Sequence, residues 1–462
     1  MWVVLSLMVL SAVAMISAGT RGTAKALPLF TFLVLLMPVR AAINLGALFD
    51  LNMQRLFVLL LVVIYVKDRE PPKDEEGQDL GWFDIPFVKL ILVNFAAMSV
   101  STIFSVNWVV SLKNLLMHAT EYYLTYVIFC ETIATTEDVE SVFNAIYAAT
   151  VVLALLALVE SYTNWNPVDY LPNEGGRFFR EGGFDIDIER GDRLKSVFPV
   201  SHLLGAAMVL GMTFTCYILS RKDDPGWKAT LAWVLLLVMG LCLYKTSTRG
   251  PWLAIVLSFA FLLFVSSPRT KRTVLIFGVL TGLLLLVRRG VYLSIERIVI
   301  SSFDTNTSIG SSYEYRYALV DLARDALSQD LLRTLLGYGP ETFFFLHLKR
   351  EFLGMEYTFL SCDSSWILSA IETGLTGVSI LAILLGGIFL YQVYNIRNLS
   401  GKLKDMMVCI AAFNLSFLFL MTNVAIYGWV QFGHIYWILA ALSVAIVRIQ
   451  KNSGEVVEGV AA

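Results

Sequence analysis

The sequence has few charged residues: they make up 16% of its 462 residues, whereas hydrophobic residues make up 57%. A soluble domain typically has about a quarter charged residues and under half apolar ones. The 35 basic residues nearly balance the 37 acidic residues, so no strong net charge favours nucleic acid as a partner. The shortage of charge excludes an ordinary soluble domain and indicates a chain that crosses a membrane many times.

Cysteine and histidine are also scarce, with five and four residues respectively. The cysteines are scattered, and four of them lie in or beside apolar runs. No CxxC pair or histidine-rich spacing occurs, so the sequence predicts no disulfide framework, no metal site and no cofactor. Residues 2–19 are apolar but follow no basic stretch, which favours a membrane helix over a cleaved signal peptide.

Long apolar runs, by contrast, fill the chain. We predict about 13 spans, of which the third is short. They lie near residues 2–19, 27–48, 55–66, 86–106, 109–130, 141–160, 199–219, 229–244, 251–266, 273–287, 366–394, 406–426 and 430–448. The predicted fold class is therefore an all-α integral membrane protein with about 12–13 transmembrane helices.

Short loops rich in lysine and arginine set the orientation, because such loops concentrate on the cytoplasmic side. They lie at residues 21–25, 221–228, 266–272 and 396–404. All four fall on one face if the predicted spans alternate. The opposite, outer face then holds two long segments, residues 161–198 and 288–365, and the second is expected to carry amphipathic helices lying across the membrane surface.

The outer face collects arginines, among them Arg177, Arg180 and Arg193 in the first long segment. A planar guanidinium matches phosphate oxygens and keeps its charge in a dry site, so this excess favours an anionic ligand. The alternative is that an arginine merely anchors a helix end at the membrane boundary, which is our interpretation of Arg288.

The stretch "KTSTRGPW" (245–252) places Arg249 just before Pro251, at the predicted start of a membrane helix. A helix start has free amide donors and the positive end of the helix dipole. The sequence therefore predicts an anion site at Arg249, with Lys245 as a further contact. Anchoring of the helix end is the alternative for Arg249 as well.

The second outer segment contains "SSYEYRYALVDLARDAL" (311–327), whose apolar residues recur at helical spacing. We expect a helix that begins at Ser311 or Ser312, ends near the glycines at 337–339 and carries Arg316 in its first turn. Asp363 stands just before the next apolar run, where it could be a plain helix N-cap or a catalytic carboxylate.

Four stretches together resemble the superfamily of O-antigen ligases and O-antigen polymerases, which are bacterial integral membrane glycosyltransferases. They are "RLKSVFPVSHLLGAAM" (193–208), "STRGPWLA" (247–254), "YRYALVDLARDAL…LLGYGPETF" (315–343) and "CDSSWILSAIETGLTG" (362–377). They stand in the family's order. The ligases have a histidine where this chain has Asp363, and aspartate there is more similar to the polymerase branch.

The resemblance implies a GT-C-like fold and a division of the chain into three parts. Residues 1–198 would be N-terminal transmembrane helices with the outer loop 161–198. Residues 199–448 would form the O-antigen ligase-like catalytic region, including the periplasmic segment 288–365, and residues 449–462 a cytoplasmic tail. The expected location is the bacterial inner membrane, with the active site facing the periplasm.

The resemblance also implies a reaction. The donor would be a glycan on undecaprenyl diphosphate, and the acceptor a sugar hydroxyl on a lipid-linked repeat unit or on lipid A-core. Arg249 and Arg316 would stabilise the leaving diphosphate without a metal, and Asp363 would act as the base, with inversion at the anomeric carbon. The products would be O-antigen, capsule or exopolysaccharide chains. Besides membrane lipids, the expected substrate contacts are Arg177, Arg180, Arg193, Lys245, Tyr315 and His347, of which His347 is the reserve base.

Two other functions stay open from the residues. Asp185 and Asp187 form a DxD pair that could bind a metal, and loss of activity in a chelator would favour it. A transporter or flippase is the other alternative, because Glu121 and Lys113 lie within a predicted span. The DxD pair is weak evidence for a metal-dependent enzyme, because it is a three-residue motif in a solvated loop. The gathering of arginines on one outer face favours an enzyme over a transporter, and no feature of the sequence favours a structural scaffold.

Overall fold

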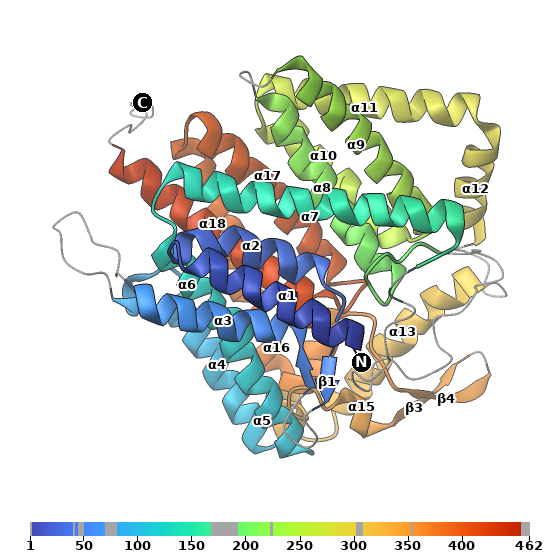
Figure 1. Cartoon of the computed structure of the whole chain (residues 1–462). Coiled ribbons are helices and arrows are strands. Elements are labelled where there is room, and N and C mark those ends of the chain that lie inside the picture. Colours follow the sequence, from blue (N-terminus) through green and yellow to red (C-terminus); the bar gives the residue numbers. More distant parts are fainter. Residues whose placement is uncertain are drawn as a thin grey trace, which may run out of the picture.

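The computed structural model describes residues 2–39, 42–44, 50–69, 81–166, 168, 193–221, 225–301, 308–352 and 354–453. Within these residues the chain is almost wholly helical, with two short antiparallel hairpins (Figure 1). The predicted all-α integral membrane protein is therefore confirmed.

Every predicted apolar segment contains a helix. The helices are α1 (Trp2–Gly19), α2 (Thr23–Leu36), α3 (Met53–Asp68), α4 (Val88–Ile103), α5 (Trp108–Met117), η2 (His118–Tyr123), α6 (Leu124–Thr132), α7 (Thr136–Thr163), α8 (Ser201–Ser220), α9 (Gly226–Lys245), α10 (Arg249–Val265), α11 (Pro268–Val287), α16 (Ser365–Asn395), α17 (Gly401–Leu420) and α18 (Val430–Asn452). The second segment is shorter than predicted. Its helix ends at Leu36 because Pro38 disfavours the helical conformation of the residue before it.

Seven helices are long and apolar enough to cross a membrane, judged by length and composition in the described residues: α7, α8, α9, α11, α16, α17 and α18. Four shorter apolar helices, α1, α2, α4 and α10, accompany them. The full count of about 12–13 spans stays a prediction.

Burial differs sharply among these helices. In the most apolar 18-residue stretch of each, 94% of α18 and 89% of α8 is buried, against 17% of α11. Helices α8 and α18 therefore lie inside the bundle, whereas most of α11 faces outward. Helix α8 packs against α7, α9, α10 and α17, so a residue on its first turn is surrounded by several other helix ends.

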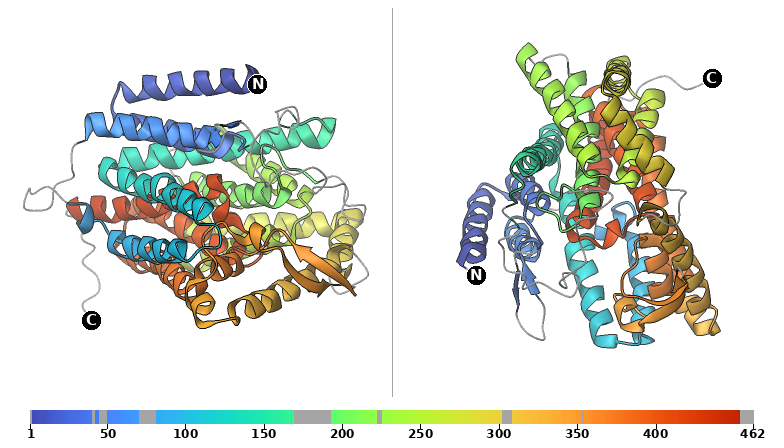
Figure 2. Two further views of the ribbon diagram at one scale, coloured as in Figure 1. Left: turned by 90° about the horizontal axis from the view of Figure 1, so that it is seen from below. Right: turned by 90° about the vertical axis from the view of Figure 1, so that its right-hand side faces the viewer.

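The segment that was predicted to lie across the outer surface forms a separate layer of short elements. They are α12 (Arg289–Ile300), α13 (Ser308–Leu327), α14 (Leu331–Leu336), α15 (Phe343–Leu346), β3 (Leu348–Phe352) and β4 (Met355–Phe359). Leu319, Leu322, Phe343, Phe359 and Ile371 form part of a second apolar core that joins this layer to α16. Helix α1 lies at the opposite edge of the molecule (Figure 2).

The predicted helix in this layer is present, with two differences. It begins at Ser308, a few residues before the expected caps, and it ends at Leu327 rather than near residue 337. Asp330 then caps the short α14 by accepting a hydrogen bond from the amide of Arg333. Gly337, with φ of 70°, ends that helix. Two helices thus replace the single one predicted.

The orientation of the bundle can be tested at the two ends of α11. A 20-residue helix is about 30 Å long, so Arg269 near its start and Arg288 just after its end should lie on opposite membrane faces; both are exposed. In a protein whose five buried cysteines have been replaced, Arg288→Cys should react with an impermeant thiol reagent added to intact spheroplasts. Arg269→Cys should react only after permeabilisation. The reverse pattern would place the start of α10 on the cytoplasmic side.

Candidate functional site

The start of α10 is fixed by a close contact with α8. A Cβ atom added to Gly205 would lie 2.6 Å from Cγ of Pro251 and 3.3 Å from Oγ1 of Thr248, so only glycine fits without displacement. Helix α10 begins at Arg249, two residues earlier than the sequence suggested. Pro251 therefore stands in its first turn, where a missing amide hydrogen costs nothing.

The turn before α10 is tightly bonded. The hydroxyl groups of Thr246 and Thr248 lie 2.6 Å apart, and Ser247 between them has a positive φ of 50°. Nε of Arg193 donates a hydrogen bond to the carbonyl oxygen of Thr246 at 3.2 Å. The amide of Leu194 donates to the carbonyl oxygen of Lys245 at 3.5 Å. Arg193 and the backbone of Lys245 thus lie beside the same turn as Arg249.

The start of α16 and the start of α10 both contact the short turn that follows α17. The amide of Ser365 donates to the carbonyl oxygen of Met421 at 2.9 Å, in the turn that follows α17. Gly250 approaches the same turn, since a Cβ atom there would lie 3.6 Å from Leu420 and 3.8 Å from Asn423. Residues 420–424 therefore bring the ends of α10 and α16 together.

Asp363, two residues before α16, is not the helix cap. That position belongs to Ser364, whose hydroxyl accepts a hydrogen bond from the amide of Ile367 at 3.3 Å. The capping interpretation of Asp363 is therefore wrong, and its carboxylate is available for another role.

The carboxylate of Asp363 is exposed at the surface, yet loss of solvation raises its pKa. A group that solvent can touch but that protein largely surrounds lies in a recess. The positive charge of Arg316 acts in the opposite direction and lowers the pKa of Asp363, so these two predicted site residues are within electrostatic reach of one another.

Arg316 itself has an unused donor. Its Nε is buried and has no hydrogen-bond partner among the described residues. A buried donor without a partner costs about 1–3 kcal/mol unless something binds it. The side chain is thus suited to an anionic ligand that completes its hydrogen bonding.

His202 joins this group, although the sequence did not single it out. It lies in the first turn of α8, one turn from Gly205 on the same helix face, and Gly205 contacts the start of α10. The charges of Arg193 and Arg316 both act on its ring. His202 is therefore within electrostatic reach of both arginines. The only sequence signal was a polar ring at the predicted start of an apolar helix.

Tyr315 plays a packing part beside the site. Its hydroxyl donates to the carbonyl oxygen of Ser361 at 2.9 Å, and its ring stacks on Phe359 with centroids 5.2 Å apart. Loss of solvation, and then the charge of Asp363, raise its pKa above the ordinary range. Tyr315 therefore fastens α13 to the loop that carries Asp363.

The remaining predicted contacts are less central. His347 is exposed, and the centroid of its ring lies 5.9 Å from that of Phe344. This packing is with a neighbouring residue of the same segment and does not involve Asp363. Arg177 and Arg180 lie outside the described residues, as do Asp185 and Asp187 of the DxD alternative. No group of three or more His, Cys, Asp or Glu that could hold a metal ion occurs within the described part of the chain.

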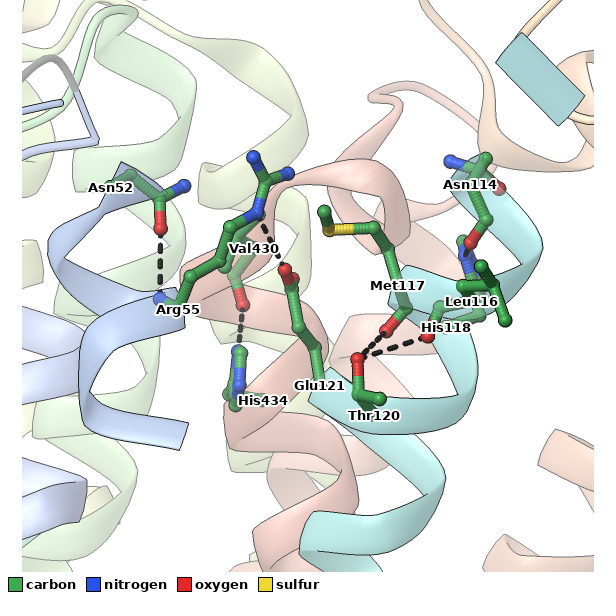
Figure 3. Close-up of polar contacts among 10 residues, drawn as sticks. All are labelled: Asn52, Arg55, Asn114, Leu116, Met117, His118, Thr120, Glu121, Val430 and His434. Atoms are coloured by element: carbon green, nitrogen blue, oxygen red, sulfur yellow. Dashed lines mark hydrogen bonds and ion pairs between the residues drawn. The ribbon is translucent and has the colours of Figure 1, made fainter. Parts of the chain in front are cut away.

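The charged residue that had suggested a transport path has a local partner. Glu121 accepts a hydrogen bond from Nε of Arg55 at 2.8 Å, and its side chain is 5% exposed (Figure 3). Removing one partner of such a buried pair leaves a charge uncompensated. The pair thus fastens α3 to η2, which accounts for Glu121 without a path.

Residues 234–382 match a family of known proteins described as O-Antigen ligase. The match contains Arg249, Arg316 and Asp363, and it confirms the resemblance to the ligase and polymerase superfamily. At family level it supports a membrane glycosyltransferase of the ligase or polymerase type. No curated protein matches the chain.

The contact between α8 and the start of α10, where Arg249 lies, can be tested by adding one methyl group. Gly205→Ala forces α8 and α10 apart, and overpacking of this kind typically costs about 1–3 kcal/mol. We expect a lower midpoint of thermal unfolding in detergent. Gly278→Ala is the matched control, because it is a helical glycine with nothing within 4 Å of an added Cβ. Equal stability of the two variants would contradict a tight contact.

Proposed function

We propose that the protein moves a glycan from undecaprenyl diphosphate to an acceptor sugar hydroxyl on the periplasmic face of the inner membrane. The outcome of this chemistry is polymerisation of O-antigen, capsule or exopolysaccharide repeat units. The observation that carries the proposal is that the start of α10, with Arg249, and the start of α16, just after Asp363, meet around residues 420–424. The charge of Arg316, from α13, acts on the same Asp363.

Each side of the reaction has a group suited to it. The acceptor oxygen forms a bond to the anomeric carbon, the bond from that carbon to the diphosphate oxygen breaks, and the acceptor proton passes to Asp363. Because the attack is direct, the anomeric configuration inverts. Loss of solvation raises the pKa of Asp363 toward neutral pH. A general base is most effective when its pKa lies near the pH at which the enzyme works.

The leaving diphosphate needs fixed positive groups, since its negative charge grows as the bond breaks. Arg249 stands at a helix start, and Arg316 has the unpartnered Nε. Two planar guanidinium groups can supply the stabilisation that a divalent metal gives in other glycosyltransferases, which is why we propose a metal-independent reaction. Arg193 and His202 would complete the anion site.

A ligase that transfers the finished glycan to lipid A-core is the second candidate, favoured by the description of the matching family. Deletion of the gene, followed by sizing of surface glycans, separates the two. Glycans of a single repeat unit would indicate a lost polymerase, whereas long chains left on the lipid carrier would indicate a lost ligase. Unchanged glycans would contradict both.

The role of Arg249 is tested in the deletion strain by complementation. Lysine keeps the charge of Arg249 but loses the two-point contact to a diphosphate, and loss of one preorganised donor typically costs about 10²–10³ in rate. We therefore expect Arg249→Lys to insert normally but to restore little glycan. Arg288 is an exposed arginine just after the end of α11, and Arg288→Lys should restore glycan synthesis fully. A fully active Arg249→Lys protein would show that Arg249 only anchors α10.

The pair of Arg316 and Asp363 predicts a change in pH dependence. Arg316 lowers the pKa of Asp363, so Arg316→Gln should raise that pKa. The acid limb of the glycan-transfer profile, below which the base is protonated, should then move to higher pH. Arg324→Gln, in the same helix and paired with Asp321 at 3.7 Å, should leave the limb in place. An unshifted limb in Arg316→Gln would show that Asp363 is not the titrating base.

A further inference from the structure

A cavity of about 70 Å³ lies beside the candidate site, between α4, α5, α16 and residues 427–428. About 10–15 Å³ of such space is enough for one water molecule, so the cavity has room for a small polar group of a few heavy atoms. Its wall includes Asn114, His118, Glu341, Ser365 and Glu372. Ser365 is only two residues from Asp363, so the cavity and the proposed base share the start of α16.

The cavity is built by a break in α16. Gly374 has φ of 69°, and the loop of residues 337–339 fills the gap. The amides of Tyr338 and Gly339 donate to the carbonyl oxygens of Ile371 and Glu372 at 3.0 and 2.8 Å. A Cβ atom on Gly374 would lie 2.3 Å from the backbone of Leu335, so the close approach requires glycine.

This break fixes two carboxylates at the cavity wall. An oxygen of Glu372 accepts a hydrogen bond from the amide of Phe343 at 3.4 Å. Glu341 has a positive φ of 61°, and its carboxylate accepts from Nδ2 of Asn114 at 3.2 Å. The two carboxylates are within electrostatic reach of each other.

His118 adds a third acceptor. Its Nδ1 lies 3.2 Å from the carbonyl oxygen of Asn114, which can only accept. Nδ1 therefore carries the proton in the neutral ring, and Nε2 is an acceptor. His118 is the first residue of the π-helical η2. The wider turns of a π-helix direct the side chains of His118 and Glu121 to different sides. Figure 3 shows Glu121 directed toward Arg55, on the side away from His118 and Asn114.

Side-chain oxygen atoms of Glu341 and Glu372 and Nε2 of His118, around a space for a few heavy atoms, are suited to a small group that forms hydrogen bonds. We propose that the cavity binds a hydroxyl or hydroxymethyl group on a sugar of the acceptor glycan and thereby selects the acceptor. The acceptor is favoured over the donor because Ser365 at the cavity wall is two residues from the proposed base Asp363, whereas Arg249 and Arg193 lie at the turn before α10. This inference rests on the proposed function.

Protection of single cysteines from alkylation tests the inference without requiring catalysis. Ser369→Cys places the thiol at the cavity wall, and Ser247→Cys places it beside Arg249. Each is made in a cysteine-free protein that also carries Asp363→Asn, which removes the proposed base and leaves the arginines in place. The probe is the lipid-linked repeat unit extracted from the deletion strain. At about ten times its dissociation constant, a bound probe should slow alkylation of Ser369→Cys by about tenfold.

A second substitution ties that protection to the cavity. Glu341→Gln should weaken probe binding by about 10- to 100-fold, since a hydrogen bond to a charged acceptor is lost, and should remove the protection. Glu356→Gln is the matched control, because Glu356 pairs with Lys349 on the exposed hairpin at 3.1 Å; there the protection should persist.

The two cysteines separate failure of this inference from failure of the proposed function. Protection at Ser247→Cys without protection at Ser369→Cys would overturn the cavity as a sugar subsite and leave the proposed function in place. Protection at neither position would count against the proposed function as well. Protection at Ser369→Cys that survives Glu341→Gln would also overturn the inference.

Discussion

The hydrogen bonds between the start of α16 and the turn after α17 hold the candidate site together. The amide and hydroxyl of Ser365 bond to the carbonyl oxygens of Met421 and Val424, and the hydroxyl of Ser364 bonds to Met421 as well. Backbone groups buried in a membrane protein must find partners inside the protein, so this junction is difficult to displace. Asp363 on one side and Gly250 on the other are positioned by it.

Helix α16 positions both the proposed base and the proposed acceptor subsite. Its first residues carry the loop with Asp363, and its break at Gly374 receives residues 337–339 and fixes Glu372 at the cavity wall. Irregular backbone at membrane depth is tolerated where protein buries it or where it lines a cavity, and both conditions hold here. The proposed base and the proposed acceptor subsite are therefore coupled through one rigid element.

Several features of the site followed from residue pattern alone. Apolar runs placed most of the long helices to within a few residues, although α2 ends well before the predicted residue 48. The stretch "STRGPW" marked the start of α10 because proline and a preceding threonine suit a first turn. The pattern could not decide between Asp363 and Ser364 as the cap of α16, since both residue types cap helices. Nor could it show that α13 would end at Leu327, because Asp330 begins a second helix by a local hydrogen bond.

By itself, the sequence determined the fold class, the helix positions and the residue types available for chemistry, because these depend on local composition and periodicity. Only the tertiary structure decided which of those residues meet. His202 and Arg316 are brought together by α8 and α13, and Glu341 and Glu372 by a broken helix and an inserted loop. Such encounters depend on packing between segments more than a hundred residues apart for the first pair and about thirty for the second, and no local pattern encodes that packing.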